Sequence, residues 1–128
     1  MTKSVEATAL TMAQEGNTTM ATFMIQGSYT PEAWAAQIKN PTERIAAVGQ
    51  MMAPLGVTFD HYWYSFGDHD FVIIASGPGT VEAAAAVLAA YGGGALTSIK
   101  TTPLLTNDEA LSAIKRASDV QYKVPAAV

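Results

Sequence analysis

Cysteine is absent from this chain of 128 residues, and several kinds of chemistry are excluded with it. Disulfides, thiolate nucleophiles and cysteine-ligated zinc or iron–sulfur sites all need that side chain. No run of about 18 apolar residues occurs, so the sequence predicts no membrane-spanning helix. The first 18 residues also lack a basic stretch followed by a long apolar core, which argues against a secretory signal. We therefore expect a cytoplasmic protein.

Charged residues are scarce, at 14% of the chain. Seven Lys and Arg stand against eleven Asp and Glu, and the basic residues form no stripe, so we expect no nucleic-acid partner. The length suits one domain with a real core. A domain with so few charges exposes apolar surface, and this favours a homo-oligomer of at least two subunits.

Hydrophobic patterns and helix-start signals predict the order β-α-β-β-α-β, followed by one more helix. The expected strands cover residues 20–25, 57–65, 71–75 and 95–102. The expected helical regions cover residues 30–52, 80–91 and 106–118. Thr30 and Thr106 are predicted N-caps, and Asn40 is predicted to cap a second helix within the first region. In the helix over 80–91 the pattern predicts an inward face, formed by Val81, Ala84, Val87, Leu88 and Tyr91.

This order is typical of a ferredoxin-like α+β fold, with a four-stranded antiparallel sheet and two helices on one face. The domain is expected over residues 20–118, after a flexible N-terminal extension (1–19) and before a C-terminal tail (119–128). No helix remains for the other face of the sheet. We expect a second copy to cover it, giving a dimeric α+β barrel.

The segment 61–70 is the richest in polar and aromatic chemistry, with both histidines of the chain. Strand alternation predicts that Phe59, His61 and Trp63 share one face, with Tyr62 and Tyr64 on the other. His61 is a candidate general base if its face meets a cavity, since burial would keep it neutral. The alternative, a hydrogen-bonded core or interface histidine, is the commoner case.

The turn that follows offers a second candidate, His69 between Asp68 and Asp70. A carboxylate beside a histidine can form an acid–base pair or part of a metal site, but Asp side chains also serve ordinary turns. With no third ligand evident, we expect neither a metal nor another cofactor. Lys100 is a third candidate, as an amine nucleophile in a cavity or as a surface lysine on a strand.

Candidate ligand-binding residues are aromatic or acidic: Tyr29, Trp34, Tyr62, Tyr64, Asp68 and Asp70. The tyrosine hydroxyls suit a phenolic or carbonyl ligand, although packing with one hydrogen bond explains them equally. Arg44 and Lys39 offer a clamp for a carboxylate, or they are solvated and paired with local acids.

Four motifs, in order along the chain, resemble a known family. They are Gly27-x-Tyr29-Thr30-Pro31-Glu32-x-Trp34, Ile38-Lys39-Asn40-Pro41-x-x-Arg44, Phe66-Gly67-Asp68-His69-Asp70 and Thr101-Thr102-Pro103-Leu104-Leu105-Thr106. On these residues the segment from 20 to about 118 is identified as a member of the GYD-domain family. The resemblance implies a ferredoxin-like subunit of a dimeric α+β barrel and supplies no reaction. His69 stands where the family's turn has an aromatic residue.

Two functions follow as hypotheses. The first is a small cofactor-independent enzyme, of lyase, isomerase or monooxygenase type, acting on an apolar or aromatic metabolite with His61 as base. The second is a non-catalytic subunit for small-molecule binding or assembly. Haem degradation is a third and weaker option. Fold by itself does not decide among them.

Overall fold

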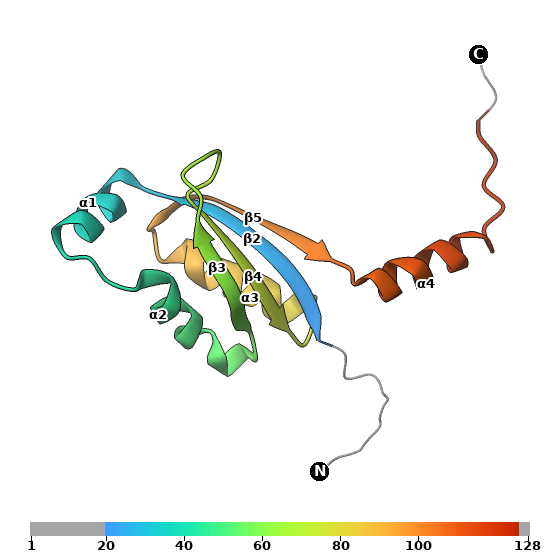
Figure 1. The fold of residues 1–128 in the computed structure, drawn as a ribbon, viewed down its shortest axis with the longest axis horizontal. Coiled ribbons are helices and arrows are strands. Elements are labelled where there is room, and N and C mark those ends of the chain that lie inside the picture. The colour runs from blue at the N-terminus through green and yellow to red at the C-terminus, as the bar shows by residue number, and fades with distance from the viewer. Residues whose placement is uncertain (1–19, 126–128) are drawn as a thin grey trace, which may run out of the picture.

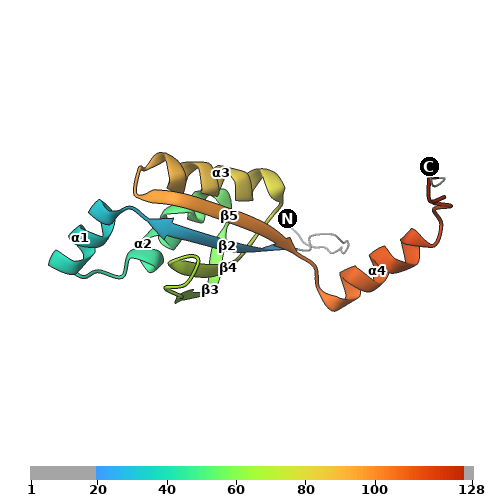
Figure 2. The same cartoon turned by 90° about the horizontal axis from the view of Figure 1, so that it is seen from above.

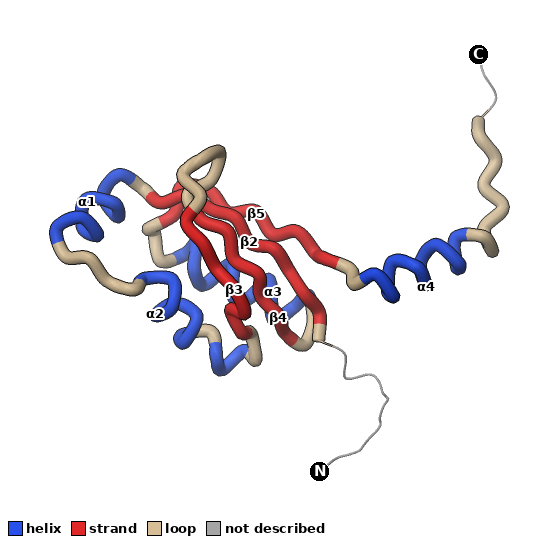
Figure 3. Tube along the Cα trace, in the orientation of Figure 1, coloured by secondary structure: helices blue, strands red, loops and turns tan. Residues whose placement is uncertain are grey.

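The computed structural model describes residues 20–125. Its sheet has the order β3-β4-β2-β5 with every pair antiparallel, and α2 and α3 pack on the same face (Figures 1 and 2). Figure 3 shows the strands and helices along the chain. The elements are β2 (Ala21–Tyr29), α1 (Pro31–Lys39), α2 (Arg44–Met51), a 3-10 turn (Ala53–Leu55), β3 (Thr58–Tyr64), β4 (Phe71–Gly77), α3 (Thr80–Gly92), β5 (Leu96–Leu104) and α4 (Asn107–Ala117). The predicted ferredoxin-like α+β fold is therefore confirmed.

The core lies between the helices and the sheet. Alternate residues of β4 are buried, with Ala75 fully so, as expected for a central strand whose one face meets helices. Ile25, Ile45 and Met52 join this cluster from β2 and α2. Strand β2 is longer than predicted and continues to Tyr29, which brings that side chain to the end of the sheet.

Two helix starts are formed as the sequence predicts. The Thr30 hydroxyl accepts a hydrogen bond from the N–H of Ala33 at 3.0 Å, with Pro31 at the first helical position. Thr106 and Glu109 form a complete capping box, each side chain accepting from the other's backbone N–H.

The predicted Asn40 cap is wrong. Asn40 ends α1 instead, because its N–H donates to the carbonyl of Ala36 at 3.0 Å. The chain then runs through Pro41 to α2, which starts at Arg44 after Glu43, whose side chain makes no capping bond. A proline soon after a helix end is common, since it cannot continue the helix.

The predicted alternation along β3 is wrong only for Phe59, because a bulge follows it; His61 and Trp63 share one face, and Tyr62 and Tyr64 the other, as predicted. Phe59 pairs with Ala75, but His61 pairs with Ile74, so Asp60 is the extra residue. Residues opposite each other in an antiparallel pair share a face. Phe59 therefore faces the helices, whereas His61 faces away from them.

The rotation predicted for α3 is wrong as well. Ala83 and Ala86 are buried, whereas Val81 and Leu88 are 75% and 72% exposed. After Thr80 and Glu82 in its first turn the helix is apolar on every side, so periodicity alone could not fix its rotation. Packing places the small side chains inward, where they allow the helix to approach the sheet closely.

The second face of the sheet, here called the open face, carries no helix within residues 20–125. Strand register assigns to it Met24, Gln26, His61, Trp63, Val72, Ile74 and Lys100, together with hydroxyl residues that include Thr22, Thr58, Ser76 and Thr102. Helix α4 leads away from the domain and has no buried residue (Figure 2). Whether a second copy covers the open face stays a prediction.

The remaining domain predictions concern the N-terminal extension and the C-terminal tail. Residues 120–125 form neither helix nor strand. The proposed flexible extension over 1–19 and the last residues of the tail lie outside the described residues. Within the described part, no helix combines the length and the apolar character needed to cross a bilayer.

Candidate functional site

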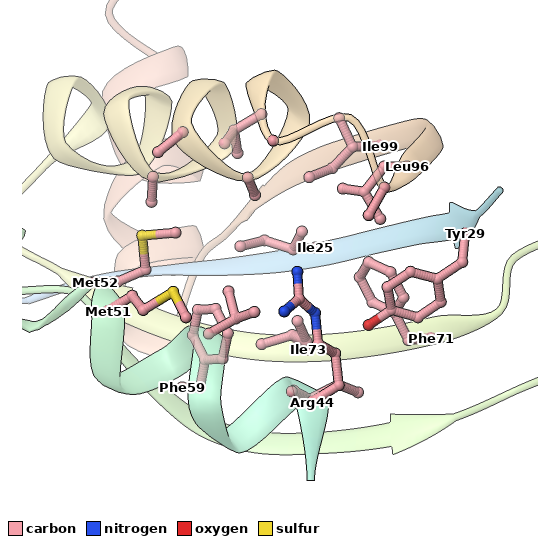
Figure 4. Close-up of a pocket in the computed structure, with 18 of the residues that line it drawn as sticks. Ile25, Tyr29, Arg44, Met51, Met52, Phe59, Phe71, Ile73, Leu96 and Ile99 are labelled. Carbon is pink, nitrogen blue, oxygen red and sulfur yellow. The ribbon is translucent and has the colours of Figure 1, made fainter. Parts of the chain in front are cut away.

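A cavity of about 300 Å³ lies between the sheet and helices α2 and α3 (Figure 4). Its walls are mainly aliphatic and aromatic side chains from β2, β3, β4, β5 and both helices. They include Ile25, Val48, Met51, Met52, Phe59, Phe71, Ile73, Val87, Ala90 and Ile99. The alanine-rich inner face of α3 leaves this space, because its short side chains do not fill the layer between helix and sheet. Such a cavity suits an apolar molecule.

Two polar side chains reach the cavity, Tyr29 at the end of β2 and Arg44 at the start of α2. Figure 4 shows the Arg44 guanidinium pointing into the space between the sheet and the helices, with the Tyr29 ring beside it. Burial raises the pKa of Tyr29 to about 12; Tyr64 and Asp70 also raise it, and Arg44 lowers it. Tyr29 therefore remains a neutral hydroxyl at physiological pH, able to donate a hydrogen bond.

Asp70 holds Tyr29 and Trp34 in position. Its Oδ2 accepts from the Tyr29 N–H and from the Trp34 indole N–H, both at 2.9 Å. The Asp70 N–H donates to the carbonyl of Gly27 at 2.7 Å. One carboxylate thus joins the β3–β4 turn to the end of β2 and to α1. In this structure Asp70 is a positioning residue for Tyr29.

An aromatic cluster surrounds this carboxylate. The Tyr29 and Trp34 rings meet edge to face at 5.4 Å, and Trp34 also contacts Tyr64 at 6.0 Å and Phe66 at 5.6 Å. Edge-to-face and tilted ring pairs are favourable arrangements, so the cluster stiffens the end of the sheet beside the cavity. The structure therefore brings together Tyr29, Trp34, Tyr64 and Asp70 from the predicted set.

A groove of about 530 Å³ adjoins the cavity and shares Tyr29, Arg44 and Ala95 with it. Its other lining residues come from α1, the α1–α2 loop and β3: Ala33, Trp34, Ala36, Gln37, Lys39, Asn40, Thr42 and Tyr64. Thr42 donates to the Gln37 side chain at 3.1 Å, and the Gln37 amide donates to the Thr42 carbonyl. These bonds hold the loop against α1.

The β3–β4 turn uses His69 through its backbone. The His69 carbonyl accepts from the Ser65 hydroxyl at 2.7 Å and from the Gly67 N–H at 3.1 Å. Phe66 adopts a positive φ of 51° there. Neither His69 nor Asp68 lines the cavity or the groove, so the structure favours the turn interpretation for this pair.

His61 and Lys100 lie on the open face, across the sheet from the cavity. The exposed His61 ring stacks on Trp63 with ring centroids 6.0 Å apart, and Lys100 of β5 lies opposite Gln26 of β2. Tyr62 faces the helix side but borders a separate depression beside α2, with Phe59 and Gly49. Among residues 20–125 no group of three His, Asp or Glu side chains is arranged to hold a metal ion.

None of the predicted catalytic residues lines the cavity: His61 and Lys100 lie on the open face, and His69 lies in the β3–β4 turn. The sequence did not predict the apolar walls of the cavity. It indicated Arg44 only as one of two basic residues that could bind a carboxylate. A local signal for Arg44 exists in the sequence. It is the single charged side chain in a helix that is otherwise uncharged, R-I-A-A-V-G-Q-M.

Fold and topology define a ferredoxin-like α+β domain, and comparison with known proteins identifies its family. The model of the family described as GYD domain matches residues 23–114, more than half of the sequence. The chain therefore belongs to the GYD domain family. No curated protein matches the sequence.

Solved structures resemble the fold at low identity. The structure of MtbAldR is 15% identical with a TM-score of 0.50, and the match covers 68% of this chain and 52% of that one. This chain thus spans about half the length of MtbAldR. The NE2512 protein of unknown function from Nitrosomonas europaea is 18% identical with a TM-score of 0.38, covering 88% of this chain and all of that one.

Proposed function

We propose that this protein binds a small, predominantly apolar molecule in the cavity between the sheet and helices α2 and α3. The observation that carries the proposal is an apolar space of about 300 Å³ bordered by two polar side chains, Tyr29 and Arg44. Ligand sites are commonly apolar hollows with a few polar groups that fix orientation. The Tyr29 hydroxyl is the expected hydrogen-bond donor to a carbonyl or hydroxyl of the ligand.

Binding is favoured over catalysis by the position of the candidate base. His61 lies on the open face, so it cannot contact a molecule held in the cavity of the same subunit. Tyr29 is a poor base at neutral pH, because its pKa is raised to about 12. An enzyme using His61 as base would need a second site on the open face.

A homodimer through the open face belongs to the same proposal. Trp63, Val72 and Ile74 lie on neighbouring strands of that face, and Trp63 is 56% exposed. Large apolar side chains gathered on one sheet face are typical of a protein–protein contact. The cavity lies on the helix side, so both can be occupied at once.

A matched pair of substitutions in α3 tests the binding proposal. Ala90 lines the cavity and Ala84 lies exposed on the same helix. Ala90→Phe should fill the space and abolish binding of the neutral fluorescent probe N-phenyl-1-naphthylamine, while Ala84→Phe should bind it like the wild type. Circular dichroism checks that both variants are folded. Equal binding by Ala90→Phe and wild type would refute the cavity as the site.

A further inference from the structure

The cavity continues past Arg44 into the groove, and the charges along this path have one sign. Lys39 and Arg44 line the groove, and Arg44 also lines the cavity. Among the described residues, no Asp or Glu lines either space. This is a local departure from a chain whose formal net charge is −4. A ligand reaching the junction therefore meets positive charge.

One carboxylate lies close to this path without lining it: Asp70, whose negative charge helps to raise the pKa of Tyr29. Asp70 Oδ2 is engaged by two N–H donors, from Tyr29 and from Trp34. A carboxylate that accepts such bonds is less available to pair with a guanidinium. Arg44 points its guanidinium into the cavity mouth (Figure 4), where its planar donors suit an oxyanion.

The cavity and the groove are lined by different types of residue, which suits a ligand with two different parts. The cavity beyond Arg44 has apolar walls, whereas the groove has Gln37, Asn40 and Thr42 beside Lys39. A neutral apolar molecule would use the first space only. A molecule with an acid group on an apolar body would use the Arg44 guanidinium as well.

We propose that the ligand class is an amphipathic anion, with an aromatic or aliphatic body in the cavity and a carboxylate-like acid group at Arg44, facing Lys39. This rests on the proposed function and narrows it. Tyr29 donates a hydrogen bond near the same junction, so the acid group is held from two sides. Lys39, exposed at the end of α1, adds attraction at longer range.

Two probes with the same aromatic skeleton test the charge requirement. N-phenyl-1-naphthylamine is neutral, and 8-anilinonaphthalene-1-sulfonate carries one added acid group. Wild type should bind the sulfonate about tenfold more tightly, since hydrogen bonds to a charged group are stronger than neutral ones. Arg44→Met keeps the apolar stem and removes the charge, so it should remove this preference while leaving the neutral probe's affinity within about twofold.

The control variant is Lys115→Met, which removes one positive charge from α4, away from the cavity. It should leave both affinities unchanged. Arg44→Lys and the salt dependence of sulfonate binding give a second test if Arg44→Met does not fold; the preference should persist in Arg44→Lys and weaken as salt rises.

The outcomes separate the two proposals. Equal affinity of wild type for both probes, or equal weakening of both by Arg44→Met, would overturn the anion proposal and leave cavity binding intact. If neither probe binds wild type, or if Ala90→Phe binds both normally, the proposed function itself fails.

Discussion

Tyr29 links the end of strand β2 to the cavity. It ends β2, receives its backbone hydrogen bond from Asp70, and presents its hydroxyl to the cavity. The raised pKa follows first from burial, because desolvation disfavours the phenolate. The Tyr29 hydroxyl therefore stays protonated at neutral pH and can donate a hydrogen bond.

The pKa shift gives a spectroscopic prediction. In an alkaline titration followed by phenolate absorbance, one of the five tyrosines should ionise near pH 12, and Tyr29→Phe should remove that component. The folded-state pKa lies above the unfolded value of 10.0, so stabilisation by this group is intact below pH 10 and declines as pH rises towards 12. An unchanged late component in Tyr29→Phe would contradict this assignment.

Asp70 gives a prediction about stability. Asp70→Ala removes the acceptor of two N–H groups, so the free energy of unfolding should fall by about 2–3 kcal/mol, measured in urea. Trp34 fluorescence should change with it, because the indole loses its partner. The control is Asp68→Ala in the same turn. Because the Asp68 side chain is exposed, this change should lower the free energy of unfolding by less than about 0.5 kcal/mol. Equal losses in both variants would contradict a special role for Asp70.

At the scale of elements, β3 and α3 decide which side chains can share a site. The bulge at Asp60 turns Phe59 toward the cavity and His61 away from it. Helix α3, apolar on every side after its first turn, is rotated so that alanines face inward. Neither feature could be derived from periodicity, since a bulge adds one unpaired residue and an apolar helix shows no preferred face.

The rotation of α3 predicts that truncating Leu88 has little effect on stability. Leu88→Ala should change the free energy of unfolding by less than about 0.5 kcal/mol, because Leu88 is 72% exposed. A Leu buried in a core would cost about 2–5 kcal/mol on the same change. Urea unfolding measures the difference. A loss above about 2 kcal/mol would show that this face is covered.

At the scale of the whole molecule, the two faces of the sheet have separate roles. One face, with α2 and α3, encloses the cavity, while the open face has no cover within residues 20–125. Helix α4 leaves the domain with all of its residues at least partly exposed (Figure 1). Both features are consistent with the proposed homo-oligomer, since short isolated helices and uncovered apolar sheet faces are rarely stable in water.

The assembly is tested by charge insertion. If the proposed homodimer forms through the open face, wild type should sediment as a dimer and Trp63→Glu as a monomer, because a buried unpaired carboxylate is costly. Ile38→Glu makes the same change on α1, where the side chain is 76% exposed, and should leave the mass unchanged. A monomeric wild type, or a dimeric Trp63→Glu variant, would contradict this mode of assembly.

The sequence by itself determined the order of elements, the antiparallel ferredoxin-like sheet, and two helix starts at Thr30 and Thr106, because caps and strand patterns act over a few neighbouring residues. Only the tertiary structure decided the bulge in β3, the rotation of α3 and the end of α1 at Asn40. Each depends on packing or on backbone bonds that a local pattern does not contain. The candidate site in the structure therefore differs from the one expected from the sequence. The sequence pointed to the histidines of segment 61–70, whereas the structure has a cavity bordered by Tyr29 and Arg44, which the packing of α2 against the sheet brings together.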